Sequence, residues 1–123
     1  MSLASTRTAV AAALSAALAA VNIKVWPSRP VPVAFGSAWL VLTLADTEEI
    51  TYAEVARLTY NVVIALGSDD LIAETEMDRI GAQLLAAMNT VGRGATLSPL
   101  TLNLDGSDLF CAVGTLITEV GSV

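Results

Sequence analysis

Few residues of this sequence have the types and spacing that enzyme chemistry requires. Its 123 residues include no histidine and one cysteine, Cys111. Histidine is the side chain that most often moves protons at neutral pH, and a cysteine nucleophile needs a nearby base. Cys111 lies in an apolar, strand-like run, so we interpret it as a small buried hydrophobe. A lone cysteine without histidine builds neither a disulfide framework nor a metal cluster, and we expect no metal and no cofactor.

The carboxylates and glycines offer no stronger candidates. Adjacent acids occur at 48–49 and 69–70, but neighbours in sequence point to different sides of a helix and make no paired site by themselves. Residues 105–108, Asp-Gly-Ser-Asp, lack the further oxygen ligands of a calcium loop and fit a hairpin turn. Residues 92–94, Gly-Arg-Gly, lack the third glycine and the following helix of a phosphate loop and fit a helix end. We therefore expect a protein that is not an enzyme.

The composition indicates one folded domain, residues 1–123, that works by joining other protein surfaces. Hydrophobic residues make up 54% of the chain and charged residues only 15%, which is the opposite of a disordered chain. A solitary monomer of this composition has few polar side chains with which to cover itself. We therefore expect apolar surface to be buried against a partner or against copies of the chain.

Charge is distributed unevenly along the sequence. Residues 1–45 contain three basic residues and no acid, whereas residues 46–123 contain three arginines and all twelve acids, for a net charge of −6. An acidic chain without a basic cluster is a poor nucleic-acid binder. A polarised chain can stack head to tail, basic face on acidic face, although a short N-terminal stretch with few acids explains the same counts.

An alanine-rich run near the N-terminus predicts an amphipathic helix over residues 4–21. Val10, Leu14, Leu18 and Val21 recur along one face, and alanine is the best helix former. The same run has the texture of a signal-peptide core, which is the alternative interpretation. A membrane span is excluded, because the thirteen residues of the apolar run fall short of the roughly 20 that a bilayer requires.

A proline-rich segment follows a short predicted strand at residues 23–26. Three prolines within residues 27–36 exclude a helix and a central strand, and they predict a stiff, extended loop. The loop is apolar, which indicates either a contact surface or a lid over the core, and a tryptophan beside it is typical of an interface anchor. The candidate interface residues are Trp26, Arg29, Val31, Val33 and Phe35.

The remaining elements are strand hairpins and one long helix. We expect strands over 37–46 and 51–66 with a polar turn at 47–50, then a helix from an N-cap at Ser68 to Gly92, then a closing hairpin. The order is α-β-β-β-α-β-β. Hairpins without βαβ spacing favour an α+β fold, in which two helices pack on one face of an antiparallel sheet of about five strands.

Four stretches of the sequence, taken in order, form a recognisable pattern. They are the helix start SLASTRTAVAAAL, the loop VWPSRPVPVAFGSAW, the strand LTYNVVIAL and the helix SDDLIAETEMDRIGAQLLAAM. In this order they resemble the tail-terminator, or tail-completion, proteins of long-tailed bacteriophages, especially of actinobacteriophages. The resemblance covers nearly the whole chain and is one of element order and texture.

The resemblance implies a homohexameric ring that caps the tail tube, ends tube polymerisation and joins the tail to the head-completion proteins of the neck. It implies contact with the major tail protein, DNA passing through the bore without specific binding, and no membrane contact. The protein would be assembled in the host bacterial cytoplasm and be part of the virion. In such a ring we expect acids to face the bore or an axial surface, and the candidates are Asp46, Glu48, Glu49, Asp105 and Asp108.

Two other functions fit the same sequence. One is a different head-to-tail connector or stopper ring, which would differ in the end of the assembly that it occupies. The other is a small cytoplasmic dimerisation or ligand-binding domain, which would assemble as about two copies rather than six.

Overall fold

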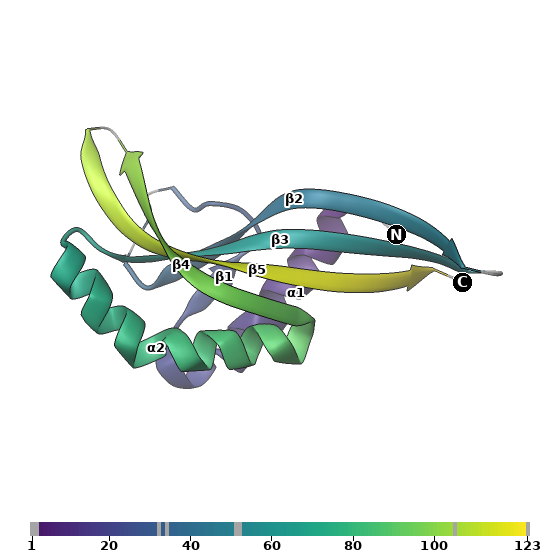
Figure 1. Ribbon diagram of the computed structural model, residues 1–123, viewed down its shortest axis with the longest axis horizontal. Coiled ribbons are helices and arrows are strands. Elements are labelled where there is room, and N and C mark those ends of the chain that lie inside the picture. Colours follow the sequence, from purple (N-terminus) through teal and green to yellow (C-terminus); the bar gives the residue numbers. More distant parts are fainter. Residues whose placement is uncertain (1–2, 32, 34, 51–52, 105, 123) are drawn as a thin grey trace.

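Two helices and a five-stranded sheet make up the protein in the computed structural model (Figure 1), which describes residues 3–31, 33, 35–50, 53–104 and 106–122. The sheet has the strand order β1-β2-β3-β5-β4. The α+β class and the five strands are as predicted. The elements are α1 (Leu3–Ala17), the 3-10 turn η1 (Ala19–Val21), β1 (Lys24–Trp26), β2 (Ser37–Ile50), β3 (Ala53–Gly67), α2 (Asp70–Val91), β4 (Arg93–Leu104) and β5 (Ser107–Ser122).

The sheet is mixed, so the expectation of a wholly antiparallel sheet is wrong for its first strand. β2, β3, β5 and β4 pair antiparallel to one another, but β1 runs parallel to β2, with Lys24 opposite Ser37 and Trp26 opposite Trp39. Parallel neighbours need a connection that returns the chain to the starting end of the sheet, and a helix is the usual one. Here residues 27–36 make that return, and no helix lies among those of them that the structure describes. We call this segment the proline loop.

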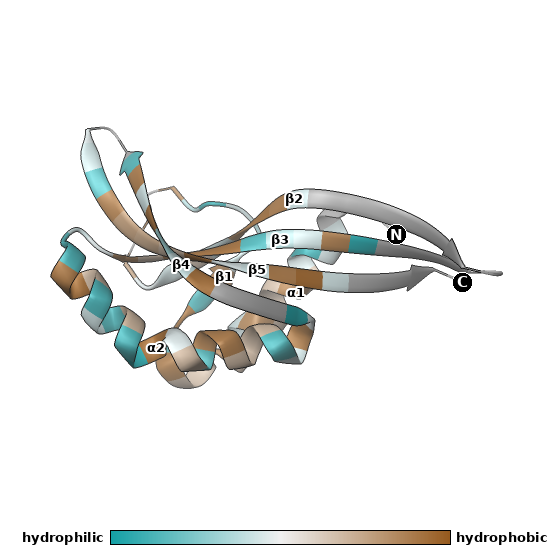
Figure 2. Ribbon diagram, in the orientation of Figure 1, coloured by the Kyte–Doolittle hydropathy of each residue, from teal (hydrophilic) through white to brown (hydrophobic). Residues whose placement is uncertain are grey.

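Both helices pack on the same face of the sheet, as predicted, and we call this the covered face. Each helix supplies a stripe of buried residues to the main core, and β3 supplies alternate residues between them. Figure 2 shows the matching alternation of hydrophobic and hydrophilic residues around α2. Fully burying one such aliphatic side chain stabilises the fold by roughly 1.5–3 kcal/mol. The main members are Val10, Leu14 and Leu18 of α1, Tyr60, Val62 and Ile64 of β3, and Ile80, Leu84 and Met88 of α2.

The opposite face of the sheet, which we call the open face, carries a second apolar cluster. Its buried members come from β2, β3 and β5, and the proline loop lies against them through Val33. The loop therefore covers part of this face. This is the lid that the sequence analysis gave as one of two interpretations of the loop. The buried members are Trp39, Val63, Ala65, Leu109 and Cys111.

The first helix ends earlier than expected and is fastened to the edge of the sheet. The α-helix stops at Ala17, and the chain passes through η1 to Asn22, which has a left-handed backbone (φ 58°). Asparagine tolerates this conformation better than most residues. The Ser15 hydroxyl donates to the Val25 carbonyl (3.1 Å) and accepts from the Val25 N–H (2.8 Å). One side chain of α1 thus satisfies both backbone groups of an edge-strand residue.

The second helix begins one residue later than predicted. Asp69, not Ser68, is the N-cap, and its carboxylate accepts from the N–H groups of Leu71 (2.8 Å) and Ile72 (3.3 Å). Such a cap satisfies donors that have no partner within the helix. Gly92 ends the helix, as expected, and its N–H donates to the Met88 carbonyl.

The predicted polar turn at 47–50 is wrong, because β2 continues as a strand through Ile50. The pairing of β2 with β3 shifts between Leu42 and Leu44, so that Thr43 forms a bulge whose hydroxyl donates to the Thr59 carbonyl (3.0 Å). The far halves of β2, β3 and β5 extend together past the end of α2 (Figure 1). The connection at 51–52 lies outside the described residues.

Candidate assembly surface

The one cysteine of the sequence is buried and unreactive as a nucleophile at neutral pH. Cys111 is 3% exposed, and burial raises the pKa of its thiol to about 11. Its Sγ lies 3.7 Å from the Leu109 carbonyl oxygen, to which it donates. At neutral pH the side chain is a protonated thiol that lacks the thiolate character of a nucleophile. This placement agrees with its interpretation as a small hydrophobe.

The acids predicted to face a bore do not form one described cluster. Asp108 is exposed near the tip of the β4–β5 hairpin, where its carboxylate accepts from Asn103 Nδ2 (3.2 Å). Asp46, Glu48 and Glu49 belong to the far half of β2, at the opposite end of the molecule from that hairpin tip (Figure 1). Their side chains and Asp105 lie outside what the structure describes. Among the described residues, no group of three acids, cysteines or histidines could hold a metal ion.

The candidate interface residues divide into a covering part and an exposed part. Val33 is partly buried against the open-face cluster, whereas Val31 is 89% exposed and Phe35 is 60% exposed. Arg29 is exposed between them and Trp26. Isolated exposed apolar residues are ordinary on a protein surface, but two on a loop of ten residues make a candidate contact. The proline loop therefore covers part of the sheet, as one of the two interpretations expected, and its exposed residues remain a candidate contact surface.

Both ends of the proline loop are held in place. At its start, Trp26 pairs with Trp39 of β2, and the Lys24 ammonium lies 3.9 Å from the centre of the Trp26 ring, a cation–π contact. At its end, the Gly36 N–H donates to the Ala65 carbonyl at the end of β3 (2.8 Å). Gly36 has φ +83°, which favours glycine over residues with a Cβ. The exposed side chains thus stand on a backbone that is fixed at both ends and stiffened by prolines.

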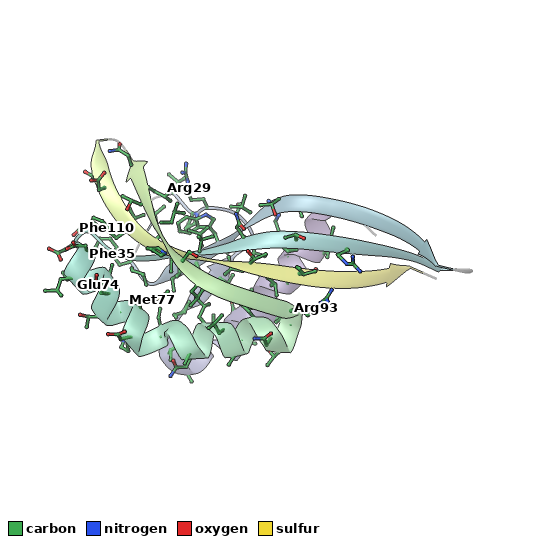
Figure 3. The ribbon with its side chains drawn as sticks, viewed as in Figure 1. Arg29, Phe35, Glu74, Met77, Arg93 and Phe110 are labelled. Carbon is green, nitrogen blue, oxygen red and sulfur yellow. The ribbon has the colours of Figure 1, made fainter. Side chains whose placement is uncertain are left out.

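A groove that the sequence did not predict lies between the first half of α2 and the β4–β5 hairpin. It has a volume of about 410 Å³. Figure 3 shows Glu74 and Met77 on α2 beneath the hairpin that carries Phe110, with Arg93 at the other end of the helix. We call this feature the α2 groove, and its lining residues are Leu66, Asp70, Ala73, Glu74, Met77, Pro99, Leu100, Thr101, Phe110, Cys111 and Ala112.

The α2 groove is apolar inside and acidic at its rim. Leu66, Ala73 and Ala112 are buried in it, while Asp70 and Glu74 are exposed one turn apart on α2. None of its eleven lining residues is basic. Two carboxylates beside an apolar hollow suit an apolar segment that carries a positive charge.

Sequence reasoning missed the groove because its walls come from segments far apart in the chain. Met77 is partly buried beside the main core and also lines the groove. The spacing of Asp70 and Glu74 was the available signal, since residues four apart share one side of a helix. Leu71 and Ile72, 68% and 54% exposed, lie at the same end of α2.

The comparisons with known proteins leave the chain without an assigned family. No family model matches it, and no curated protein matches it. Neither described helix combines the length and the apolar character that a bilayer crossing requires.

Proposed function

We propose that this chain is a structural subunit of a bacteriophage virion that forms a ring on the end of the tail tube. The ring, of about six copies, ends tube polymerisation and joins the tail to the neck proteins. The observation that carries this proposal is the proline loop, whose exposed Val31 and Phe35 stand on a backbone fixed at both ends. A rigid, apolar, preordered segment loses little entropy when it binds another protein.

The charge of the chain supports the same proposal. A ring through which DNA passes must not hold the DNA, and a net charge of −6 per subunit disfavours contact with phosphates. The sequence has no histidine, and its one cysteine, Cys111, is buried. A structural role needs surfaces that bind other proteins, and the chain offers exposed apolar residues and an uneven distribution of charge.

The decisive experiment removes the protein from the phage that encodes it. Without a tail terminator, tubes grow to irregular lengths, whereas loss of a head-side connector or stopper leaves free tails of normal length. Electron microscopy of the lysate measures the length distribution, and the intact gene supplied from a plasmid is the control. Normal tail lengths without the protein would overturn the proposal. Native mass spectrometry of the purified chain separates a ring of about six copies from a dimeric ligand-binding domain.

A further inference from the structure

We propose that the α2 groove of one subunit receives the proline loop of a second copy of this chain. In this contact Val31 and Phe35 enter the apolar groove, and Arg29 lies beside the carboxylates of Asp70 and Glu74. The inference rests on the proposed ring and names the contact that closes it. Three features of the described residues carry it: apolar fit, opposite charge and the exposure of the loop's side chains in their own subunit.

The apolar surfaces match in character and size. The groove offers buried aliphatic walls with Phe110 and Met77 at its side, and the loop offers a valine and a phenylalanine that are mostly exposed. The groove's volume of about 410 Å³ lies within the roughly 300–1,000 Å³ that binding pockets usually have. A few side chains are enough to fill it. Burying both surfaces removes apolar area from water, which drives association.

The charges of the two surfaces are opposite. The loop carries Arg29, follows Lys24, and belongs to the stretch of residues 1–45, which contains no acid. The groove has Asp70 and Glu74 at its rim and no basic residue in its lining. An arginine is well suited to a carboxylate at an interface, because its planar guanidinium can donate two hydrogen bonds. The pairing gives the uneven charge of the sequence a physical role.

The occupant is a second copy because the exposed side chains of the loop do not fill the groove of their own subunit. Val33 packs on the open-face cluster and the Gly36 N–H is bonded to Ala65, which fixes the loop within its own chain. Yet Val31 and Phe35 stay 89% and 60% exposed. A contact between two different patches of identical chains is heterologous, and its repetition closes a ring when the rotation permits. The main alternative occupant, a small apolar ligand, would leave the loop without a role in assembly.

Charge reversal tests the contact in solution. Arg29→Glu and Glu74→Arg should each weaken ring formation by about tenfold or more, and the double variant should recover much of the loss, because it restores an opposite pair. The control is Asp78→Arg, the same change on the same helix at an exposed residue that does not line the groove. Sedimentation velocity over a concentration series measures the ring fraction. Circular dichroism confirms that each variant is folded.

Disulfide trapping tests the geometry directly. In a Cys111→Ala background, Val31→Cys on the loop and Thr101→Cys at the groove place one thiol on each surface. Diamide should oxidise the two thiols of adjacent copies to a disulfide and give a ladder of covalent oligomers that ends at the closed ring. Each single cysteine variant should give dimers at most. A reduced sample is the control.

The outcomes separate this contact from the ring itself. Rings that persist in Arg29→Glu and Glu74→Arg, or a double-cysteine variant that forms rings but no ladder, would overturn the contact and leave the proposed function standing. A crosslink confined within one chain, seen as a monomer that migrates faster, would also overturn it. Tails of normal length in the absence of the protein would overturn the proposed function whatever the variants do.

Discussion

At the residue scale, two buried side chains make the fold sensitive to alkaline pH. Burial raises the pKa values of the Cys111 thiol, to about 11, and of the Tyr60 hydroxyl, against which the charge of Arg7 acts in the opposite direction. Both groups are neutral when protonated, so the folded state holds their protons more tightly than the unfolded chain does. Their stabilising contribution is complete below the unfolded pKa values and is lost as pH rises through the folded ones.

We therefore predict that the free energy of unfolding falls as pH rises from 8 to 11, with Cys111 contributing about 1–2 kcal/mol of the loss. Urea unfolding at several pH values measures it. Other groups also titrate in this range, so Cys111→Ala is the matched comparison and should show a shallower decline. An equal decline in both proteins would contradict the assignment to this thiol.

Tyr60 gives a second comparison at the same scale. Its side chain is fully buried, and its hydroxyl makes no hydrogen bond to the described residues. A buried polar group without a partner costs stability. Tyr60→Phe removes only that oxygen, so it should leave stability at pH 7 unchanged or raise it, and it should also lessen the alkaline decline.

At the element scale, the junction between α2 and β4 depends on a close backbone approach. A Cβ at Gly92 would collide with the Ile117 carbonyl oxygen of the neighbouring strand, whereas a Cβ at Gly81 would meet its nearest atoms at 3.8 Å. We predict that Gly92→Ala lowers the free energy of unfolding by about 1–3 kcal/mol. Gly81→Ala, inside the same helix, should raise it by up to about 1 kcal/mol. Thermal unfolding of both measures the contrast, and equal shifts would contradict it.

The start of α2 allows a similar pair of variants. Because Asp69 accepts two backbone N–H groups, Asp69→Ala should destabilise the protein by about 1 kcal/mol. Ser68→Ala should change stability by only a few tenths of a kcal/mol, although serine is also a common N-cap. Urea unfolding of the two variants decides between the caps. A larger loss in Ser68→Ala would restore the cap that the sequence suggested.

The elements that the sequence predicted well are those whose signal is local. Apolar periodicity located both helices, and alternation located β3 and the closing hairpin, because burial on one side of an element leaves a repeat in its own residues. Residues 47–50 were predicted as a turn because Thr-Glu-Glu is polar, yet β2 continues there by pairing with β3. The parallel pairing of β1 was also missed. Pairing depends on distant residues, and no local pattern encodes it.

At the scale of the whole molecule, the sequence predicted one of the two candidate surfaces, the proline loop, and missed the other, the α2 groove. The proline loop was visible because three prolines and exposed apolar residues are unusual together in one short segment. The α2 groove was not, since its shape depends on how far the β4–β5 hairpin stands from α2. The bore-facing role of the five acids stays a prediction, and the described members lie near the hairpin tip (Asp108) and in the far half of β2 (Asp46, Glu48 and Glu49).

One pair of valines separates the loop's observed role, covering the sheet, from its proposed role, contacting a second copy. Val33 packs against the open-face cluster, and Val31 is almost fully exposed only two residues away. Val33→Ser should lower the free energy of unfolding by about 1–2 kcal/mol, because it exposes the cluster and buries a hydroxyl. Val31→Ser should leave unfolding within about 0.5 kcal/mol of the parent.

Association should show the reverse order for the same two variants. Val31→Ser removes a side chain that the proposed ring would bury, so it should weaken assembly by about fivefold or more, as loss of a central interface residue does. Unfolding is measured by urea titration below the concentration of assembly, and ring formation by sedimentation velocity above it. If Val31→Ser left assembly intact, the loop would be a lid alone. If it lowered stability as much as Val33→Ser, the two roles would be one.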